Sequence, residues 1–131
     1  MIVGIGSDLI AIARIQHLLN RFPDRFFTRV FSKEEQEFSL LKKNRAAFLA
    51  KRFAAKEALL KALGIGMRSG ITWHDMTIRN NDLGQPYFVL SGKTREHFQM
   101  LGGTHIHLSL SDTDDLAQAF VVIESCKERG R

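Results

Sequence analysis

The segment Arg45–Leu63 constrains the fold more than any other, because it carries the strongest helix pattern of the chain. Gly64 follows it directly, and glycine is favoured just after the last turn of a helix. Apolar side chains recur at helical spacing along one stripe, which is formed by Leu49, Phe53, Leu60 and Leu63. The rest of the fold must therefore provide a surface against which this long helix packs.

Shorter patterns on both sides of the long helix predict strands and further helices. Strands are expected at residues 2–6, 76–79, 87–90, 106–110 and 119–124. Helices are expected at 9–22, closed by Pro23, at 33–41 behind a capping box of Ser32 and Glu35, and from Ser91 or Thr94 to 101, with a mobile loop at 64–72. Because short turns join the strands, we predict one α+β domain over residues 1–131, with a mainly antiparallel sheet packed against the long helix.

Glu57 is the anomaly of the long helix. At about 100° per residue it lies roughly 40° from Phe53, within or beside the apolar stripe. A buried carboxylate is costly unless a cation, a metal or several hydrogen-bond donors compensate it. Lys61 follows one turn later, so the two residues either form an ordinary helix ion pair or build a site in which Glu57 binds a metal and Lys61 faces a phosphate.

Asp8 stands where the first predicted strand gives way to the first predicted helix, a position at which open-sheet proteins often build sites. Ser7 or Asp8 would equally make a good helix N-cap. Gly4 and Gly6 match a dinucleotide fingerprint only in part, because Leu9 occupies the third glycine position. No Walker lysine follows the glycines of the predicted loop, so neither of these two nucleotide folds is expected.

Residues 104–112 alternate between apolar and polar types and predict a strand with two unlike faces. The core face would consist of Ile106, Leu108 and Leu110. The opposite face would carry His105, His107, Ser109 and Ser111, which either contact phosphate or ribose oxygens or simply face solvent. A His-x-His pair on one strand can also bind zinc, but no third ligand stands at a recognisable spacing.

The net charge of +5 favours an anionic partner. An uneven series of basic residues occupies the N-terminal part of the chain and consists of Arg14, Arg21, Arg25 and Arg29. This series is either a solvated surface or a docking patch for an acidic protein. A nucleic-acid-binding module is a rival class, but ten of the twelve aromatic residues are phenylalanine and mostly fall at helical core spacing, not on a stacking strand.

The location of the protein is expected to be the cytoplasm. A single cysteine, Cys126, excludes an internal disulfide and fits a reducing compartment. The apolar N-terminus lacks a basic leader and a small-residue cleavage site, and Asp8 interrupts it, so it is not expected to be a signal peptide. No apolar run approaches the roughly 20 residues that cross a bilayer, so no membrane partner is expected.

Four segments together resemble one known family. They are GIGSDLIAIARI at 4–15, FLAKRFAAKEALLKALGIG at 48–66, NDLGQPYF at 81–88 and HLSLSD at 107–112. In this order and spacing they are similar to the holo-[acyl-carrier-protein] synthases, the small bacterial type of 4′-phosphopantetheinyl transferase. An aspartate near residue 8 combined with a helix bearing Lys-Glu-x-x-x-Lys is the most specific part of the resemblance.

The resemblance implies a reaction and a site. In this family a carrier-protein serine attacks the β-phosphorus of coenzyme A, and adenosine 3′,5′-bisphosphate leaves, as a step of fatty acid biosynthesis. Asp8 and Glu57 would hold magnesium, and Lys61 would face the pyrophosphate. His107 would lie near the adenosine 3′-phosphate, with Arg52 and Ser109 as further contacts to the nucleotide. Glu57 or a water on the metal would take the serine proton.

The resemblance also implies partners. Family members form homotrimers with the site between neighbouring subunits, so a homotrimer is expected. Arginines of the first helix dock the acidic carrier protein, which supports Arg14, Arg21 and Arg25 as contacts. Asp112 stands where many relatives have histidine and receives no role, and Ser7 is not expected to be a ligand. A metal-dependent phosphohydrolase using Asp8 and Glu57 is the second rival class.

Overall fold

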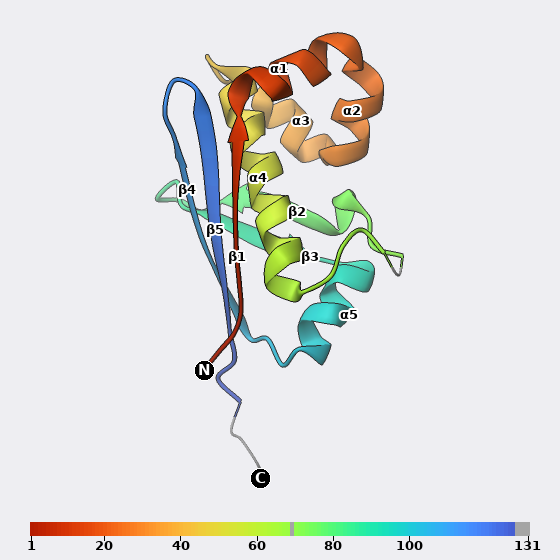
Figure 1. Ribbon diagram of the computed structural model, residues 1–131, viewed down its shortest axis with the longest axis vertical. Helices are drawn as coiled ribbons and strands as arrows, with labels where there is room; N and C mark the ends of the chain where they lie inside the picture. Colours follow the sequence, from red (N-terminus) through yellow and green to blue (C-terminus); the bar gives the residue numbers. More distant parts are fainter. Residues whose placement is uncertain (69, 128–131) are drawn as a thin grey trace.

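The computed structural model describes residues 1–68 and 70–127 and confirms the α+β class (Figure 1). Its elements in chain order are β1 (Ile2–Ala11), α1 (Ile12–Arg21), α2 (Pro23–Val30), α3 (Lys33–Ser39), α4 (Arg45–Leu63), the 3-10 turn η1 (Trp73–Asp75), β2 (Met76–Asn80), β3 (Pro86–Leu90), α5 (Gly92–Met100), β4 (His105–Asp112) and β5 (Leu116–Glu124). No helix in these two stretches is both long and apolar enough to span a bilayer.

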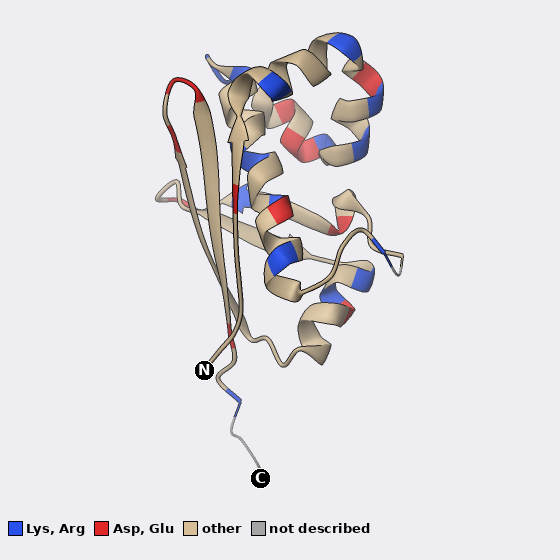
Figure 2. Cartoon of the chain, viewed as in Figure 1, with Lys and Arg blue, Asp and Glu red and all other residues tan. Residues whose placement is uncertain are grey.

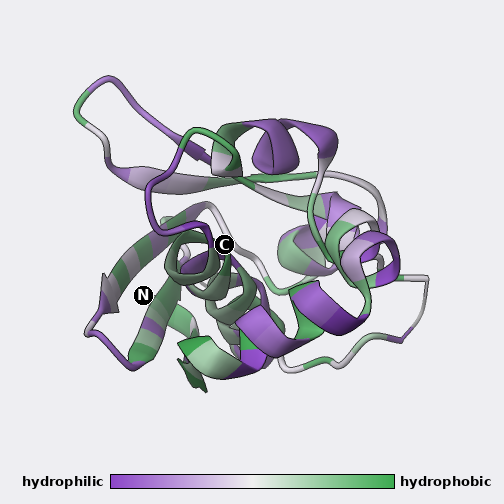
Figure 3. Ribbon diagram, turned by 90° about the horizontal axis from the view of Figure 1, so that it is seen from above, coloured by the Kyte–Doolittle hydropathy of each residue, from purple (hydrophilic) through white to green (hydrophobic). Residues whose placement is uncertain are grey.

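All strand pairs are antiparallel, as the short turns predicted. β1, β5 and β4 form a three-stranded sheet in that order, while β2 and β3 form a separate hairpin. α4 packs against β1 and β5, and Figure 3, which looks nearly along α4, shows the three-stranded sheet on one side of it. α1, α2 and α3 gather at one end of α4 (Figure 1).

The bounds predicted for the long helix are confirmed, but the single apolar stripe is too narrow. The side chain of Asn44 caps the start of α4 by accepting from the Ala47 amide at 3.1 Å, and Gly64 ends it with a φ of 73°. Ala54 and Ala58 are fully buried, whereas Phe53 is only partly buried. The reason is that the sheet covers one side of α4, while α1 and α3 cover others. A helix enclosed in this way has little amphipathic contrast.

The predicted boundary between the first strand and the first helix is wrong. β1 continues to Ala11, which pairs with Leu116 of β5, and α1 begins only at Ile12. Asp8 is therefore a strand residue, and neither it nor Ser7 caps a helix, because the N-cap is Ala11 and no side chain bonds there. Pro23 does not merely close α1. It occupies the first turn of α2, where its missing amide hydrogen costs nothing.

The remaining elements follow the predictions with shifted ends. The hairpin at β2 and β3 and the capping box of Ser32 and Glu35 are confirmed, although α3 ends at Ser39. α5 starts after Ser91, whose side chain makes no capping bond, and Thr94 lies buried inside the helix. β4 and β5 are longer than predicted because they pair along the whole segment from 105 to 112. The predicted loop at 64–72 contains Ser69, which lies outside the described residues, and its mobility stays a prediction.

Candidate active site

Two glycines bring β1 into close contact with α4. A Cβ atom at Gly6 would lie 2.0 Å from the carbonyl oxygen of Ala58, and one at Gly4 would lie 2.2 Å from that of Ala62. Both distances are too short for any side chain, so the strand and the helix pack backbone to backbone. Asp8 follows Gly6 on the same face of β1, since residues two apart on a strand point the same way. Its carboxylate therefore faces α4.

Asp8, Glu57 and Lys61 meet at this contact. Lys61 Nζ lies 3.2 Å from Asp8 Oδ1 and donates to the Ser7 carbonyl oxygen at 2.9 Å. Burial raises the pKa of Glu57, and the negative charge of Asp8 raises it further, whereas Lys61 and Arg14 lower it. The structure thus brings together all three residues that the sequence singled out as catalytic, and it assigns Lys61 to Asp8 instead of the simple helix ion pair with Glu57.

The two carboxylates fit a hard divalent cation. They come from different elements, and the charge of one disfavours ionisation of the other. A cation between them would remove that repulsion, and two carboxylate oxygens with water and phosphate are ligands that magnesium accepts. Asp8 and Glu57 are therefore the residues that would hold it.

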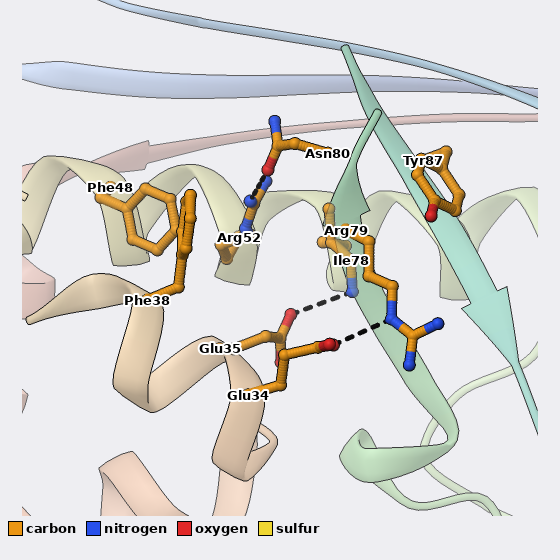
Figure 4. Close-up of a pocket in the computed structure, with 9 residues that line it drawn as sticks. All are labelled: Glu34, Glu35, Phe38, Phe48, Arg52, Ile78, Arg79, Asn80 and Tyr87. Atoms are coloured by element: carbon orange, nitrogen blue, oxygen red, sulfur yellow. Dashed lines mark hydrogen bonds and ion pairs between the residues drawn. The ribbon is translucent and has the colours of Figure 1, made fainter. Parts of the chain in front are cut away.

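Arg52 lies on another side of α4, in a pocket of about 210 Å³ (Figure 4). Its guanidinium is buried, donates to Asn80 Oδ1 and stacks over the ring of Phe48 at 4.6 Å. Its Nε is buried without a hydrogen-bond partner among the described residues. A wider groove of about 550 Å³ adjoins this pocket, and Lys42, Lys51 and Arg52 supply its cations. The combined cavity suits an anionic ligand with an apolar portion.

Within one chain, His107 and Ser109 lie apart from the carboxylates of Asp8 and Glu57. On β4 the apolar residues are partly buried and the polar ones exposed, so the predicted alternation is confirmed. His107 pairs in register with Val122 and Ser109 with Phe120, whereas Asp8 pairs with Ala119, one residue out of phase. His107 and Ser109 therefore face the side of the sheet opposite to α4, and Asp8 faces α4.

Residues 4–121 match the model of the 4′-phosphopantetheinyl transferase superfamily. The chain belongs to this superfamily. A holo-[acyl-carrier-protein] synthase of Phenylobacterium zucineum is 53% identical over 129 residues, which cover 95% of this chain and 94% of the relative. The crystal structure of the synthase from Neisseria meningitidis is 36% identical, covers 95% of this chain and 100% of its own, and has a TM-score of 0.88. The synthase from Bacillus anthracis in complex with coenzyme A (3′,5′-ADP) is 35% identical, with coverages of 95% and 98% and a TM-score of 0.79.

The basic series predicted for the N-terminal part of this phosphopantetheinyl transferase lies on α1 and α2 (Figure 2). Arg14, Arg21 and Arg25 are all exposed. The guanidinium groups of Arg21 and Arg25 lie over the ring of Phe22, at 5.4 and 5.9 Å from its centre. Arg14 differs from the other two because its charge also lowers the pKa of Glu57. It therefore belongs to the electrostatic surroundings of the carboxylate site as well as to the basic surface.

A buried ion pair next to the candidate site was not predicted from the sequence. Lys56 Nζ lies 2.6 Å from Glu35 Oε1 and donates to the carbonyl oxygen of Val30 at 2.7 Å. Burial lowers the pKa of Lys56, and Glu35 opposes that change. Glu35 also accepts from the amides of Ser32 and Ile78. The capping-box pattern already explained Glu35, so it did not indicate an ion pair. Lys56 lay outside the predicted apolar stripe of the long helix.

A second ion pair involves Asp112, for which no role was predicted. Lys51 Nζ lies 3.0 Å from Asp112 Oδ1 and so links α4 to the end of β4. His107 Nε2 lies 2.9 Å from Glu124 Oε1, and this contact lowers the pKa of Glu124. Both pairs are exposed enough to contribute little to the stability of the transferase fold.

Proposed function

We propose that this transferase moves 4′-phosphopantetheine from coenzyme A to a serine of apo-acyl carrier protein, in fatty acid biosynthesis. The observation that carries the proposal is the meeting of Asp8, Glu57 and Lys61 at the contact between β1 and α4. Its relatives are named holo-[acyl-carrier-protein] synthase, and one such relative was solved with coenzyme A. The cytoplasmic location stays a prediction.

In the proposed reaction the serine oxygen attacks the β-phosphorus of coenzyme A, and the bond to the bridging oxygen of adenosine 3′,5′-bisphosphate breaks. Positioning and charge neutralisation dominate such chemistry. Magnesium, held by Asp8 and Glu57, would supply positive charge at the pyrophosphate. Lys61 stabilises the negative charge that grows on the leaving group. Glu57 or a water on the metal is proposed to accept the serine proton.

The nucleotide end of coenzyme A is proposed to occupy the groove beside Arg52. Three cations line this groove, and the Nε of Arg52 has a hydrogen atom to donate. Adenosine bisphosphate carries both phosphates and an aromatic base, and the rings of Phe38 and Phe48 lie next to the guanidinium (Figure 4). Phosphate groups in this groove would pair with the charges of Lys42, Lys51 and Arg52.

The test of the function is the mass of apo-acyl carrier protein after incubation with coenzyme A, magnesium and the transferase. We expect the mass of each carrier-protein chain to increase by one phosphopantetheine group. Incubation without carrier separates the rival activity, since a phosphohydrolase would release adenosine bisphosphate steadily from coenzyme A alone. Unmodified carrier together with such release would assign the chain to the hydrolases.

Lys61→Ala is expected to lower kcat for transfer and to leave the KM for coenzyme A nearly unchanged. Neutralising charge on the departing pyrophosphate helps most in the transition state, so its loss appears in turnover. Steady-state kinetics of Lys61→Ala and Lys61→Arg measure the split, and Arg is expected to recover part of kcat. Lys93→Ala is the matched control, because Lys93 is an equally exposed cation paired with a carboxylate at 3.2 Å. A raised KM with normal kcat would make Lys61 a binding residue only.

Arg21→Glu is expected to raise the KM for carrier protein several-fold and to leave the KM for coenzyme A unchanged. Exposed charge pairs contribute about 1 kcal/mol or less each, and salt screens them, so the effect should shrink as ionic strength rises. Arg21 tests docking more cleanly than Arg14, whose charge reaches Glu57. Arg95→Glu on α5 has the same charge change on an exposed helix and should have no effect. Equal losses for both substrates would refute docking at Arg21.

We further propose a homotrimer with its sites between subunits. Asp8 and His107 lie on opposite faces of one sheet, so a single coenzyme A contacts both only when a second copy supplies one of them. The sheet face away from α4 also exposes four large apolar side chains, Ile5, Leu9, Leu116 and Phe120, beside the polar residues of β4. Exposed apolar side chains rimmed by polar residues mark an interaction site.

Phe120→Asp is expected to convert the assembly to monomers and to abolish most transfer activity. Phe120 is 41% exposed in the single chain, so the change places a charge in the proposed interface without opening a cavity in the core. Sedimentation equilibrium measures the mass. Leu41→Asp is the control, because Leu41 is an exposed apolar residue that follows α3 and belongs to no strand of this sheet. A monomeric wild-type chain, or a variant that keeps its mass, would contradict the trimer.

A further inference from the structure

Three side chains that could hold a metal ion meet at the end of the three-stranded sheet where β1 begins and β5 ends (Figure 1). His105 opens β4 and lies opposite Glu124, the last residue of β5, and Cys126 follows two residues later. One nitrogen, one carboxylate oxygen and one sulfur from these residues all lie within 4.8 Å of one another. Cys126 Sγ and His105 Nδ1 lie 3.6 Å apart. Only His105 of the His-x-His pair belongs to this cluster, and the other two donors come from the end of β5 and the segment after it.

The donor set selects the kind of ion. Imidazole nitrogen, thiolate sulfur and carboxylate oxygen are the ligands of zinc, whereas magnesium takes oxygen donors. With zinc-to-ligand distances of about 2.0–2.3 Å, tetrahedral donors lie roughly 3.5 Å apart. The sulfur and the imidazole nitrogen already lie 3.6 Å apart, and all three donor atoms lie within 4.8 Å of one another.

The backbone around the cluster is fixed by hydrogen bonds. The Thr104 hydroxyl donates to the Glu124 carbonyl oxygen at 3.1 Å and accepts from the Cys126 amide at 2.9 Å. The amide of Ser125 donates to the Met1 carbonyl oxygen at 2.7 Å, and the N-terminal ammonium group donates to the Ser125 carbonyl oxygen at 2.9 Å. These bonds hold the segment after β5 against its neighbours. They therefore keep Cys126 beside His105.

Glu124 also has the outer hydrogen bond that metal-binding carboxylates usually make. His107 Nε2 lies 2.9 Å from Glu124 Oε1, which orients the carboxylate and leaves Oε2 to bind an ion. The rings of His105 and His107 stack with their centres 6.5 Å apart, so the two imidazoles stand side by side on the same face. Within one chain this face is opposite to the one from which Asp8 projects, so the cluster shares no ligand with the proposed magnesium site.

We propose that His105, Glu124 and Cys126 form a binding site for zinc or a similar borderline divalent ion, with one coordination position open to water. The site does not depend on the proposed transfer reaction. Binding releases the thiol proton of Cys126 to solvent, because the thiolate is the ligand. Three protein ligands with an open position give reversible binding at the surface in place of a closed structural site.

Cobalt titration of the full chain tests the proposal, because Co²⁺ replaces Zn²⁺ and reports its ligands by absorption. We expect one Co²⁺ per chain, a near-ultraviolet thiolate-to-cobalt band, and displacement by Zn²⁺ but not by millimolar Mg²⁺. Cys126→Ser should abolish the band. His105→Ala and Glu124→Gln should each weaken binding more than tenfold, since even loss of an outer partner costs on the order of 10–100-fold. His17→Ala, an exposed histidine on α1, is the matched control.

Three outcomes would overturn the site: no cobalt band in the wild-type chain, a band that survives Cys126→Ser, or affinities that His105→Ala and Glu124→Gln leave unchanged. The last would describe a single reactive thiol. Alkylation of Cys126 in the wild-type protein provides a second measurement that needs no variant, and it should block binding. Glu57→Gln should retain the cobalt signal, and loss of the signal there would place the ion at the carboxylates facing α4.

Discussion

Glu57→Gln is expected to lower the rate of carrier modification by about 10²–10³-fold, the loss typical when one preorganised charge-stabilising group is removed from a transition state. The change keeps the shape of a partly buried side chain, so the fold should persist. It removes one of two carboxylates facing the proposed cation, so magnesium dependence should weaken as well. Asp8→Asn is expected to act in the same direction. Mass spectrometry of the carrier over a magnesium titration measures both effects.

Glu37→Gln provides the matched control for this prediction. Glu37 is an exposed carboxylate on α3, and its loss should change neither the rate nor the magnesium dependence. Circular dichroism of all variants checks the fold. Near-normal turnover of Glu57→Gln at limiting magnesium would remove Glu57 from the metal site and from the proton transfer together.

The same site gives a second, physical readout. Asp8 raises the pKa of Glu57, so Asp8→Asn should lower the Glu57 pKa toward its ordinary value in the metal-free chain. Lys61 acts in the opposite sense, so Lys61→Ala should raise it. Both shifts are the electrostatic basis of the catalytic proposal and are observable by carbon-13 titration of the Glu57 carboxyl group.

Glu57 could be singled out from the sequence as a candidate site residue because it breaks a local rule. Glu57 stands beside an apolar stripe, and Lys61 follows it one turn later. Their convergence with Asp8 could not be derived from periodicity. It depends on Gly4 and Gly6, which let β1 touch the backbone of α4, a contact between segments about fifty residues apart in the chain.

Other parts of the site could not be predicted from the sequence, because they depend on which face of a sheet a residue occupies. The alternation at 104–112 predicted two faces of β4 correctly, but only the register with β5 shows that His107 faces away from Asp8. The same register brings Glu124 and Cys126 to His105. Strand pairing between distant segments carries this information, and a single sequence does not contain it.

The predicted start of the first helix was wrong for a related physical reason. Residues 7–11 carry a pattern that suits either a helix start or a strand. Pairing of β1 with β5 as far as Ala11 decided for the strand, since the ladder bonds satisfy backbone groups that a helix would have satisfied within itself. Tertiary pairing thus overrode the local signal of Ser7 and Asp8 as caps.

Lys56→Met is expected to lower the free energy of unfolding by about 3–5 kcal/mol, because removing one partner of a buried ion pair leaves the other charge buried alone. Lys56 is fully buried, and its ammonium group contacts Glu35, the Val30 carbonyl oxygen and, at 3.4 Å, the Trp73 carbonyl oxygen. These bonds tie α2, α3 and η1 to α4 beside Glu57. Urea unfolding at neutral pH measures the loss, which is a large part of the roughly 5–15 kcal/mol of a typical domain.

A second substitution identifies the stranded carboxylate as the cause of this loss. Lys56→Met combined with Glu35→Gln should recover part of the lost stability at neutral pH, because the amide leaves no buried charge without a partner. Lys93→Met, which breaks the exposed pair with Glu96, should change stability by no more than about 0.5 kcal/mol. No recovery in the double variant, or an equal loss for Lys93→Met, would mean that packing of the lysine stem, and not the buried charge pair, holds these elements to α4.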